Sequence, residues 1–469
     1  MMSETSSHTR SGGACTVRSA RSIDPPRRQR SPPGTRSSGC ADGTVRQPLD
    51  DSASRPCFEF CRNRCPAVTV PSGHAPPTGG AGGGGHLVRI NQRIGGRGRY
   101  ATAIALVAAA ALTLAGCARD TGGGGGAQAG ECERVAPPSV PAASAQPAPE
   151  APKADASRLK VGLAYDIGGR GDASFNDAAA AGLDRAVAEL GLQKANTREA
   201  TAQAGESEDA GTNRLRQLAQ SGFNPIIAVG FNYATGVKTV ATEFPNVQFA
   251  IVDDDTVELP NVKPLVFAEE QGSFLVGAAA ALKTSTCKVG FIGGVDNPLI
   301  QKFDVGYAQG AEAVAPSIDV ESAYISPAGD FTGFNDATRA TEIASGQYDG
   351  GADISFAAAG QSNQGVFAAA QTAQRKAIGV DSDQYNSPQL TQVRDTIMTS
   401  MIKRVDVAVY GYVNAVAGNT VAQLPARFDL ANNGVGYSTS GGQVDDIVPQ
   451  LEAYKAAIIA GQIDVKSTK

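Results

Sequence analysis

The chain has 469 residues, 42% of them hydrophobic and 19% charged, which is enough for two or three domains with a buried core. Its formal net charge of −5 combines +9 from residues 1–116 with −14 from the remainder. The acidic remainder would repel phosphate backbones, which argues against a nucleic-acid partner. All three histidines lie in the first segment, at His8, His74 and His86. Ser-His-Asp catalysis, Cys-His catalysis and most zinc sites are therefore excluded from the remainder.

Residues 1–86 are rich in Arg, Ser, Pro and Gly and show no apolar periodicity. Such a segment cannot bury enough surface to offset its chain entropy, so we expect a disordered extension. Cys57, Cys61 and Cys65 have a spacing that fits no zinc template well. The use of Arg without Lys indicates a GC-rich reading frame, and we expect the natural start to lie near residue 87 or 88, downstream of this extension.

Residues 87–116 have the features of an export signal. Four arginines between positions 89 and 99 precede an uncharged, apolar run over residues 100–116. The run ends in Leu114-Ala115-Gly116-Cys117, which resembles the lipobox of bacterial lipoproteins. This resemblance implies that Cys117 is lipidated and anchors the mature protein to the extracytoplasmic face of the cell membrane. The alternative is a transmembrane anchor with an incidental cysteine, although the run is short for a spanning helix.

Residues 117–157 have the composition of a tether. A glycine run at 122–126 predicts flexibility, and the Pro/Ala-rich stretch 137–152 predicts a more extended chain. Cys132 lies in this tether, and Cys287 lies in the body. A disulfide between them is left open here, because a tether has little reason to be fixed to the body.

Residues 158–469 alternate between strand and helix patterns. Apolar runs rich in β-branched residues predict strands at 160–165, 225–229, 247–252, 288–292, 352–356 and 377–380. Amphipathic or Ala-rich stretches predict helices at 174–190, 208–220, 233–243, 270–282, 299–314, 334–344 and 363–375. This alternation predicts an α/β fold with parallel sheets flanked by helices.

A weak internal repeat indicates two lobes. Residues 160–162 and 288–290 both read Lys-Val-Gly, and each opens a predicted strand that leads through a Gly/Asp-rich loop into a helix. We expect a first lobe over about 158–283 and a second over about 284–400, with later segments crossing back. Ligands of open α/β sheets bind beyond the carboxyl ends of the strands, so the predicted ligand cleft lies between the lobes.

The loop after the first strand, residues 166–177, is the most distinctive. Its glycines permit positive φ and a close backbone approach to a ligand. Ser174 is expected to cap the following helix, with Asp177 at the third helical position. Turn chemistry plus a cap explains these residues but leaves Phe175 unexplained. The loop has no Gly-Lys-Ser/Thr sequence, so a phosphate-binding loop is not expected.

Similar polar loops follow later strands, at 230–232, 253–255, 330–336, 360–365 and 381–383. Each alone is typical of a turn or helix cap, but their recurrence after successive strands favours a site. Three consecutive aspartates at 253–255 raise calcium binding as an alternative. The loop lacks the alternating oxygen ligands of an EF-hand, so no metal is expected there.

Across its length the body resembles the basic membrane protein family, the purine-nucleoside-receptor-like substrate-binding lipoproteins of ABC importers. The matching stretches, in family order, are 172–177 (DASFND), 269–277 (EEQGSFLVG), 333–336 (GFND), 378–384 (IGVDSDQ) and 399–406 (TSMIKRVD). The resemblance implies a two-lobed type I periplasmic-binding fold, no enzymatic activity and no cofactor. It also implies a monomer that binds a purine nucleoside and partners an ABC permease and its ATPase.

By the same resemblance, Phe175 and Phe334 would stack on the two faces of a purine. Asn176 and Asp172 would meet the base or the wall of the first lobe, and Asp253 would line the same side. Aromatic faces suit a flat ring, so the implied roles agree with the chemistry of the residues.

Asp381 and Lys403 would meet the ribose hydroxyls, and Gly360 would let the backbone approach the ligand. Residues 360–363 depart from the family pattern, since Gln361 and Asn363 stand where a second glycine and a threonine are expected; these amides would alter ligand preference. Residues 272–274 are interpreted as close helix packing within the first lobe.

Three other functions remain as alternatives. A nucleoside-processing enzyme would use the carboxylates but lacks a histidine and a recognisable nucleophile. A transcriptional regulator with this fold would need an N-terminal DNA-binding unit, where this chain has an export signal. A binding protein for another small solute, such as a sugar, would share the architecture.

Overall fold

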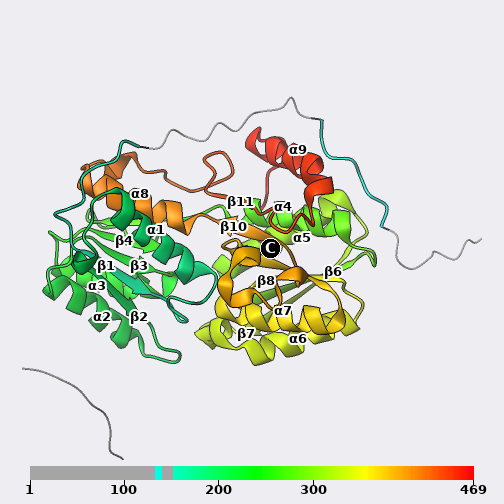
Figure 1. Cartoon of the computed structure of the whole chain (residues 1–469), viewed down its shortest axis with the longest axis horizontal. Coiled ribbons are helices and arrows are strands. Elements are labelled where there is room, and N and C mark those ends of the chain that lie inside the picture. The colour runs from blue at the N-terminus through cyan, green and yellow to red at the C-terminus, as the bar shows by residue number, and fades with distance from the viewer. Residues whose placement is uncertain (1–131, 140–150, 469) are drawn as a thin grey trace, which may run out of the picture. The chain divides into compact units, whose positions relative to one another are not determined.

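The computed structural model describes residues 132–139 and 151–468. The expected extension 1–86, the signal 87–116 and Cys117 lie outside the described residues. No helix among the described residues is both long and apolar enough to cross a bilayer. The described chain forms two α/β lobes, each with its own sheet, as predicted (Figure 1).

The first lobe contains an all-parallel sheet in the order β2-β1-β3-β4-β5. Its strands are β1 (Val161–Tyr165), β2 (Thr197–Thr201), β3 (Ile226–Val229), β4 (Phe249–Val252) and β5 (Val262–Leu265). Its helices are α1 (Phe175–Glu189), α2 (Glu208–Gln220), α3 (Ala234–Glu243) and α8 (Val405–Ala417), the last of which packs against α1. β1, β3 and β4 are buried along their whole length, as central parallel strands require.

The second lobe contains a sheet in the order β11-β10-β9-β8-β6-β7, parallel except for β11. Its strands are β6 (Lys288–Val295), β7 (Asp319–Ser326), β8 (Ile354–Ala358), β9 (Lys376–Asp381), β10 (Ile397–Lys403) and β11 (Val435–Tyr437). Its helices are α4 (Glu269–Lys283), α5 (Pro298–Val314), α6 (Ala337–Asp349), α7 (Asn363–Ala373) and α9 (Val448–Ile459). The two Lys-Val-Gly runs mark β1 and β6, which are equivalent central strands of the two sheets.

The expected lobe boundary near residue 283 is wrong, because α4 belongs to the second lobe. α4 packs against α5 so closely that a Cβ on Gly277 would lie 2.0 Å from the carbonyl oxygen of Tyr307. A Cβ on Gly310 would lie 1.9 Å from the carbonyl oxygen of Phe274. Close helix packing is thus the correct interpretation of residues 272–274, but in the other lobe. The chain crosses between lobes at residues 266–268, immediately before α4.

Three such crossings form the hinge. The first is 266–268, the second is Arg404 between β10 and α8, and the third is 428–434, which leads into β11. Ala268 N donates to Phe428 O at 2.8 Å, and the Phe267 and Phe428 rings stack with centroids 5.1 Å apart. Arg404 N donates to Gly434 O at 2.9 Å, so the three crossings are hydrogen-bonded to one another.

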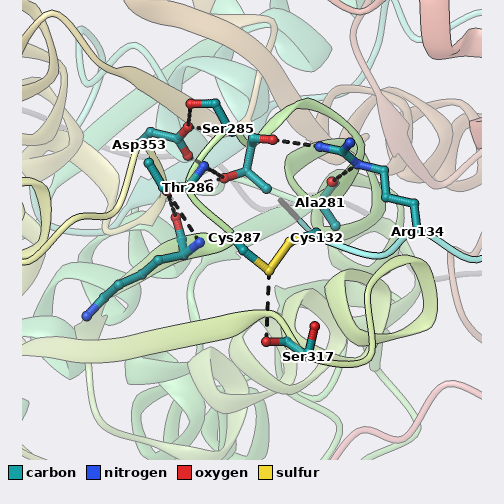
Figure 2. The surroundings of a disulfide bond; sticks show 10 residues. Cys132, Arg134, Ala281, Ser285, Thr286, Cys287, Ser317 and Asp353 are labelled. Carbon is teal, nitrogen blue, oxygen red and sulfur yellow. Dashed lines mark hydrogen bonds between the residues drawn. A yellow bond between two sulfur atoms is a disulfide. The ribbon is translucent and has the colours of Figure 1, made fainter. Parts of the chain in front are cut away.

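A disulfide fixes part of the expected tether to the second lobe. Cys132 and Cys287 are bonded, with their Cα atoms 5.2 Å apart (Figure 2). Beside the disulfide, Arg134 donates to the carbonyl oxygens of Ala281 at 3.0 Å and Thr284 at 2.6 Å. The pairing of these two cysteines, which the sequence left open, is therefore formed. Sequence offered no reason for the contact, because it depends on a site 155 residues away.

Candidate ligand-binding site

A cavity lies between the two lobes. Its lining from the first lobe is Asp166, Ile167, Asp172, Phe175, Asn176, Gly230, Phe231 and Asp253. Its lining from the second lobe is Leu299, Ile300, Phe303, Phe334, Ala358, Gly360, Val380, Asp381 and Lys403. All eight residues that the sequence singled out as ligand-binding therefore surround one cavity.

The carboxyl ends of the strands place the polar part of this lining. Asp253 directly follows β4 in the first lobe, and Asp381 and Lys403 are the last residues of β9 and β10 in the second. Parallel strands bring such residues to one edge of each sheet, and these two edges face the same cavity. The cavity therefore lies where the sequence predicted the cleft.

Phe175 and Phe334 line the cavity from opposite lobes. Phe175 is the first residue of α1, as predicted. The prediction that Phe334 begins a helix of the same kind is wrong, because it lies in a 3-10 helix (Phe331–Asn335) and α6 begins at Ala337. A Cβ on Gly294 would lie 2.5 Å from the Phe334 ring, so only glycine allows the ring to rest on β6.

Asp172, not Ser174, caps α1. Its Oδ1 accepts from the backbone N of Ser174 at 2.9 Å and of Asp177 at 3.0 Å, and its Oδ2 accepts from Asn176 N at 2.9 Å. The Ser174 hydroxyl makes no capping bond. Asp177 accepts from Gly171 N and Ala173 N, so the predicted capping box does not form. A carboxylate two residues earlier is the better acceptor for several backbone N–H groups.

Asp172 and Asn176 together form a wall of the first lobe. Asn176 Nδ2 donates to Asp172 Oδ2 at 2.9 Å and to Ile167 O at 3.2 Å, while Asn176 Oδ1 accepts from Asp166 N at 3.0 Å. Burial raises the pKa of Asp172 to about 6, against the opposing effect of the backbone N–H groups. Most of the hydrogen-bonding capacity of both side chains is thus used within the lobe.

Ser174 instead joins the two lobes. Its hydroxyl donates to Asp381 Oδ2 at 2.7 Å, and Ser382 Oγ donates back to Ser174 O at 2.9 Å. Gln384 Nε2 donates to Ala173 O at 3.0 Å. The lobes are therefore in direct contact beside the cavity, and Asp381 is held from the first lobe.

The Lys403 side chain is 1% exposed and is surrounded by acids and rings. Its Nζ lies 2.7 Å from Asp253 Oδ2 and 3.2 Å from Glu269 Oε1. The Nζ also lies 5.1 Å from the centroids of Phe175 and Phe267. The ion pairs of Lys403 are thus with Asp253 and Glu269, and not with Asp381, which was expected to meet the ribose beside it.

Burial and charge set the protonation of this cluster. Burial acts to lower the pKa of Lys403, but the carboxylates of Asp253, Glu269 and Asp381 outweigh it and raise that pKa. Burial raises the pKa of Asp253 to about 7, with Lys403 opposing and Glu269 adding to the shift. The cluster therefore presents a charged ammonium beside Asp253, whose own pKa is raised by burial.

Gly360 lines the cavity with a φ of +57°, consistent with its expected close backbone approach. The two amides that were expected to alter ligand preference, Gln361 and Asn363, do not line the cavity. Asn363 is buried, its Oδ1 accepts from Ala359 N, and its Nδ2 donates to Gln384 Oε1. Its amide therefore braces the loops of the second lobe.

Sequence reasoning did not name six large or charged lining residues: Asp166, Ile167, Phe231, Leu299, Ile300 and Phe303. Asp166 is the first carboxylate after β1, a position that could have identified it. Burial raises its pKa to about 6. Phe231 meets Phe331 of the other lobe edge to face, with centroids 5.7 Å apart. The residues of α5 carry no signal beyond their place in the first turns of a helix that follows a strand.

No group of three or more metal-binding side chains occurs among the residues that the structure describes. In the 253–255 loop, Asp253 pairs with Lys403 and Asp254 accepts from Thr256 N at 2.9 Å. These contacts account for two of the three aspartates without a calcium ion.

A cavity of polar and aromatic residues between two hinged α/β lobes is the arrangement found in solute-binding proteins. In agreement, the chain is similar to an ABC transporter solute-binding protein from Aeropyrum pernix K1, with a TM-score of 0.55 and 26% identity over 66% of this chain and 94% of that one.

Residues 159–469 match the family of PnrA-like ABC transporter substrate-binding proteins, and the chain belongs to that family. It is 31% identical to the ABC transporter nucleoside-binding protein BmpA of Lactococcus lactis, over 66% of this chain and 89% of the relative. It is also 30% identical to an uncharacterized lipoprotein of Pyrococcus abyssi, over 61% of this chain and 70% of that protein. The family comprises substrate-binding proteins of ABC transporters rather than enzymes.

Proposed function

We propose that this protein binds a purine nucleoside, of the adenosine, guanosine or inosine type, and delivers it to an ABC permease and its ATPase. The observation that carries the proposal is the pair of rings, Phe175 and Phe334, that line one cavity from opposite lobes. A flat heteroaromatic base between two such rings gains stacking energy on both faces, with about 1–3 kcal/mol for each base–ring contact.

The polar residues suit a hydroxyl-bearing ligand. Asp381 and Lys403 lie at neighbouring strand ends of the second lobe, and Asp166 and Asp253 face the cavity from the first. Carboxylates accept hydrogen bonds from sugar hydroxyls and from purine N–H groups, and an ammonium donates to sugar oxygens. The name of the Lactococcus lactis relative, a nucleoside-binding protein, agrees with this ligand class.

We further propose that residues 87–116 are an export signal, that Cys117 is lipidated and that residues 1–86 are not part of the mature protein. The lipobox-like sequence before Cys117 supports an anchor on the extracytoplasmic face of the membrane. The lipoprotein name of the Pyrococcus abyssi relative agrees with it. The mature protein is proposed to act as a monomer.

The test is retention of a ligand from a mixture. Ligand-free protein is incubated with equal amounts of purine nucleosides, pyrimidine nucleosides, ribose and common monosaccharides, then desalted, denatured and analysed by mass spectrometry. The proposal predicts an intact purine nucleoside as the retained compound. Retention of a monosaccharide would replace the proposal with sugar binding, and release of free base and ribose would indicate an enzyme.

A further inference from the structure

Two adjacent acids begin α4 at the first hinge crossing, and each reaches a different one of the other crossings. Glu270 accepts from Arg427 Nη2 with both carboxylate oxygens at 2.6 Å, and Arg427 immediately precedes the third crossing. Glu269 Oε1 lies 3.2 Å from Nζ of Lys403, which immediately precedes the second crossing. The pair Glu269-Glu270 therefore ties the first crossing to both of the others.

The two ion pairs differ in their surroundings. The Arg427 side chain is 40% exposed, and neither Glu270 nor Arg427 lines the cavity. The side chains of Glu269 and Lys403 are each 1% exposed, and Lys403 lines the cavity while Glu269 stands behind it. One pair is thus confined to the hinge, whereas the other joins the hinge to the candidate ligand site.

The hydrogen bonding of Glu269 is incomplete. Neither of its carboxylate oxygens accepts a hydrogen bond from any residue that the structure describes. Among the described residues, its charge is compensated by Lys403 and by Lys302, whose Nζ lies 3.6 Å from Oε2. Burying a carboxylate that accepts no hydrogen bonds costs desolvation free energy. The attraction to a nearby ammonium offsets that cost only while the ammonium stays in place.

Lys403 has more donors than its hydrogen-bonded partner uses. An ammonium group has three N–H donors, and one of them serves Asp253 at 2.7 Å. Asp253 belongs to the first lobe, so this bond must lengthen when the lobes separate. Glu269 and Lys403 flank the hinge on the side of the second lobe, so their contact need not change with the opening angle.

We propose that Glu269 is a positioning residue that holds the Lys403 ammonium at the cavity while the lobes open and close, and so couples ligand contact to the hinge. Glu270 is by contrast a hinge clamp with no effect on ligand recognition. The inference rests on the proposed function in one respect, namely that a solute contacts Lys403.

The experiment is a double-mutant cycle on the mature protein, with Glu269→Gln, Lys403→Met and both together, and with Glu270→Gln as the matched control. Inosine, guanosine and adenosine are titrated calorimetrically into each variant. We expect Glu269→Gln to weaken nucleoside binding by roughly tenfold and Glu270→Gln by less than about twofold. In the Lys403→Met background, Glu269→Gln should weaken binding by less than about twofold. Equal losses in the two glutamine variants, or a full loss from Glu269→Gln without Lys403, would overturn the proposal.

Two measurements separate this proposal from the proposed function. If the wild-type protein binds no nucleoside, the proposed function fails. The contact between Glu269 and Lys403 is then tested by the urea midpoints of wild type, Glu269→Gln, Lys403→Met and the double variant. If the midpoint shift of the double variant equals the sum of the two single shifts, the contact is refuted. If Glu269→Gln does not fold, Glu269→Asp keeps the charge but shortens the side chain, and it should weaken nucleoside binding in the same direction. Wild-type affinity in Glu269→Asp would count against a need for this contact.

Discussion

The same triplet, Phe-Asn-Asp, occurs beside the cavity in both lobes, at 175–177 and at 334–336, with different local structures. In the first lobe the triplet is the opening turn of α1, and its Asn176 is buried. In the second lobe it ends a 3-10 helix, Asn335 is exposed, and Asp336 caps α6 by accepting from Arg339 N at 2.9 Å. Only the phenylalanines have the same role, as each ring faces the cavity.

The difference comes from where the capping carboxylate stands. Asp172 lies three residues before Phe175, so the helix begins at the first residue of the triplet. In the second lobe the cap is Asp336 itself, two residues after Phe334, so the helix begins beyond the triplet. A short motif therefore places a ring at a site without determining the backbone that carries it.

Removing the two capping aspartates, Asp172 and Asp336, should give the largest difference in stability between the two lobes. Asp172→Ala deprives buried N–H groups of Ser174, Asn176 and Asp177 of their acceptor, so we expect a loss of about 3 kcal/mol in the free energy of unfolding. Asp336→Ala removes an ordinary cap and should cost about 1 kcal/mol. Urea unfolding of the ligand-free proteins measures both. Equal losses would mean that the two triplets are held alike, against the structure.

Removal of the two rings should instead give similar effects on binding. Either Phe175→Ala or Phe334→Ala should weaken nucleoside binding by roughly five- to a hundredfold, because each deletes one stacking contact of about 1–3 kcal/mol. Phe175 should lie at the upper end, since its ring also faces the Lys403 ammonium. Calorimetric titration together with ligand-free melting distinguishes this from a core role. Unchanged affinity with a lowered melting midpoint would assign the rings to the core.

The loop 166–177 in the first lobe and the loop 330–336 in the second lobe should also differ in how their aspartates respond to pH. In the first loop burial raises the pKa of Asp166 to about 6, whereas in the second the hydrogen bonds from Thr332 lower the pKa of Asp330. A folded-state pKa above the unfolded value near 4 means that the folded protein binds the extra proton. The stability from Asp166 is therefore full below pH 4 and is lost as the pH rises through about 6.

We expect the titration of Asp166 to lower the free energy of unfolding by on the order of 1–2 kcal/mol as the pH is raised from 4 to 7. Urea midpoints of wild type and Asp166→Asn across this range measure the effect. The difference between the two proteins should shift in favour of Asp166→Asn as the pH rises. A constant difference would show that Asp166 titrates normally.

The smallest expected effect concerns Asn335. Because its side chain is exposed, Asn335→Ala should change the free energy of unfolding by less than about 0.5 kcal/mol. Asn176→Ala serves as the paired variant, and it should be clearly destabilising because its amide holds the backbone of Asp166 and Ile167. Thermal melts of the two variants provide the comparison, and a destabilised Asn335→Ala would remove the distinction between the lobes.

Local pattern was enough to predict six strands, β1, β3, β4, β6, β8 and β9, and the polar loops that follow several of them. It did not predict the central strand β10, and Lys403 at the end of that strand was named from the family resemblance. The predicted eight residues surround one cavity because β1, β4, β9 and β10 are parallel and end at facing edges. The partners of those residues could not be predicted. Lys403 pairs with Asp253, 150 residues away, and with Glu269 at the hinge, and nothing in the local sequence distinguishes these acids from Asp381.

Elements with weak local signals were missed for a similar reason. β2 reads Thr-Arg-Glu-Ala-Thr and has no apolar run, because it is a partly exposed edge strand. α4 could be predicted as a helix, but its lobe depends on the close contact between Gly277 and Tyr307 of α5. The Cys132–Cys287 bond likewise depends on distant packing that composition does not reveal.

The central claim is that the cavity recognises base and sugar together through residues of both lobes. Calorimetric titration of guanosine, guanine and ribose into ligand-free wild-type protein tests it most directly. The account predicts that guanosine, or another purine nucleoside in its place, binds with a Kd of about 1 μM or tighter, and that ribose alone binds at least about a hundredfold more weakly. Binding of a monosaccharide with no measurable binding of any purine nucleoside would contradict it.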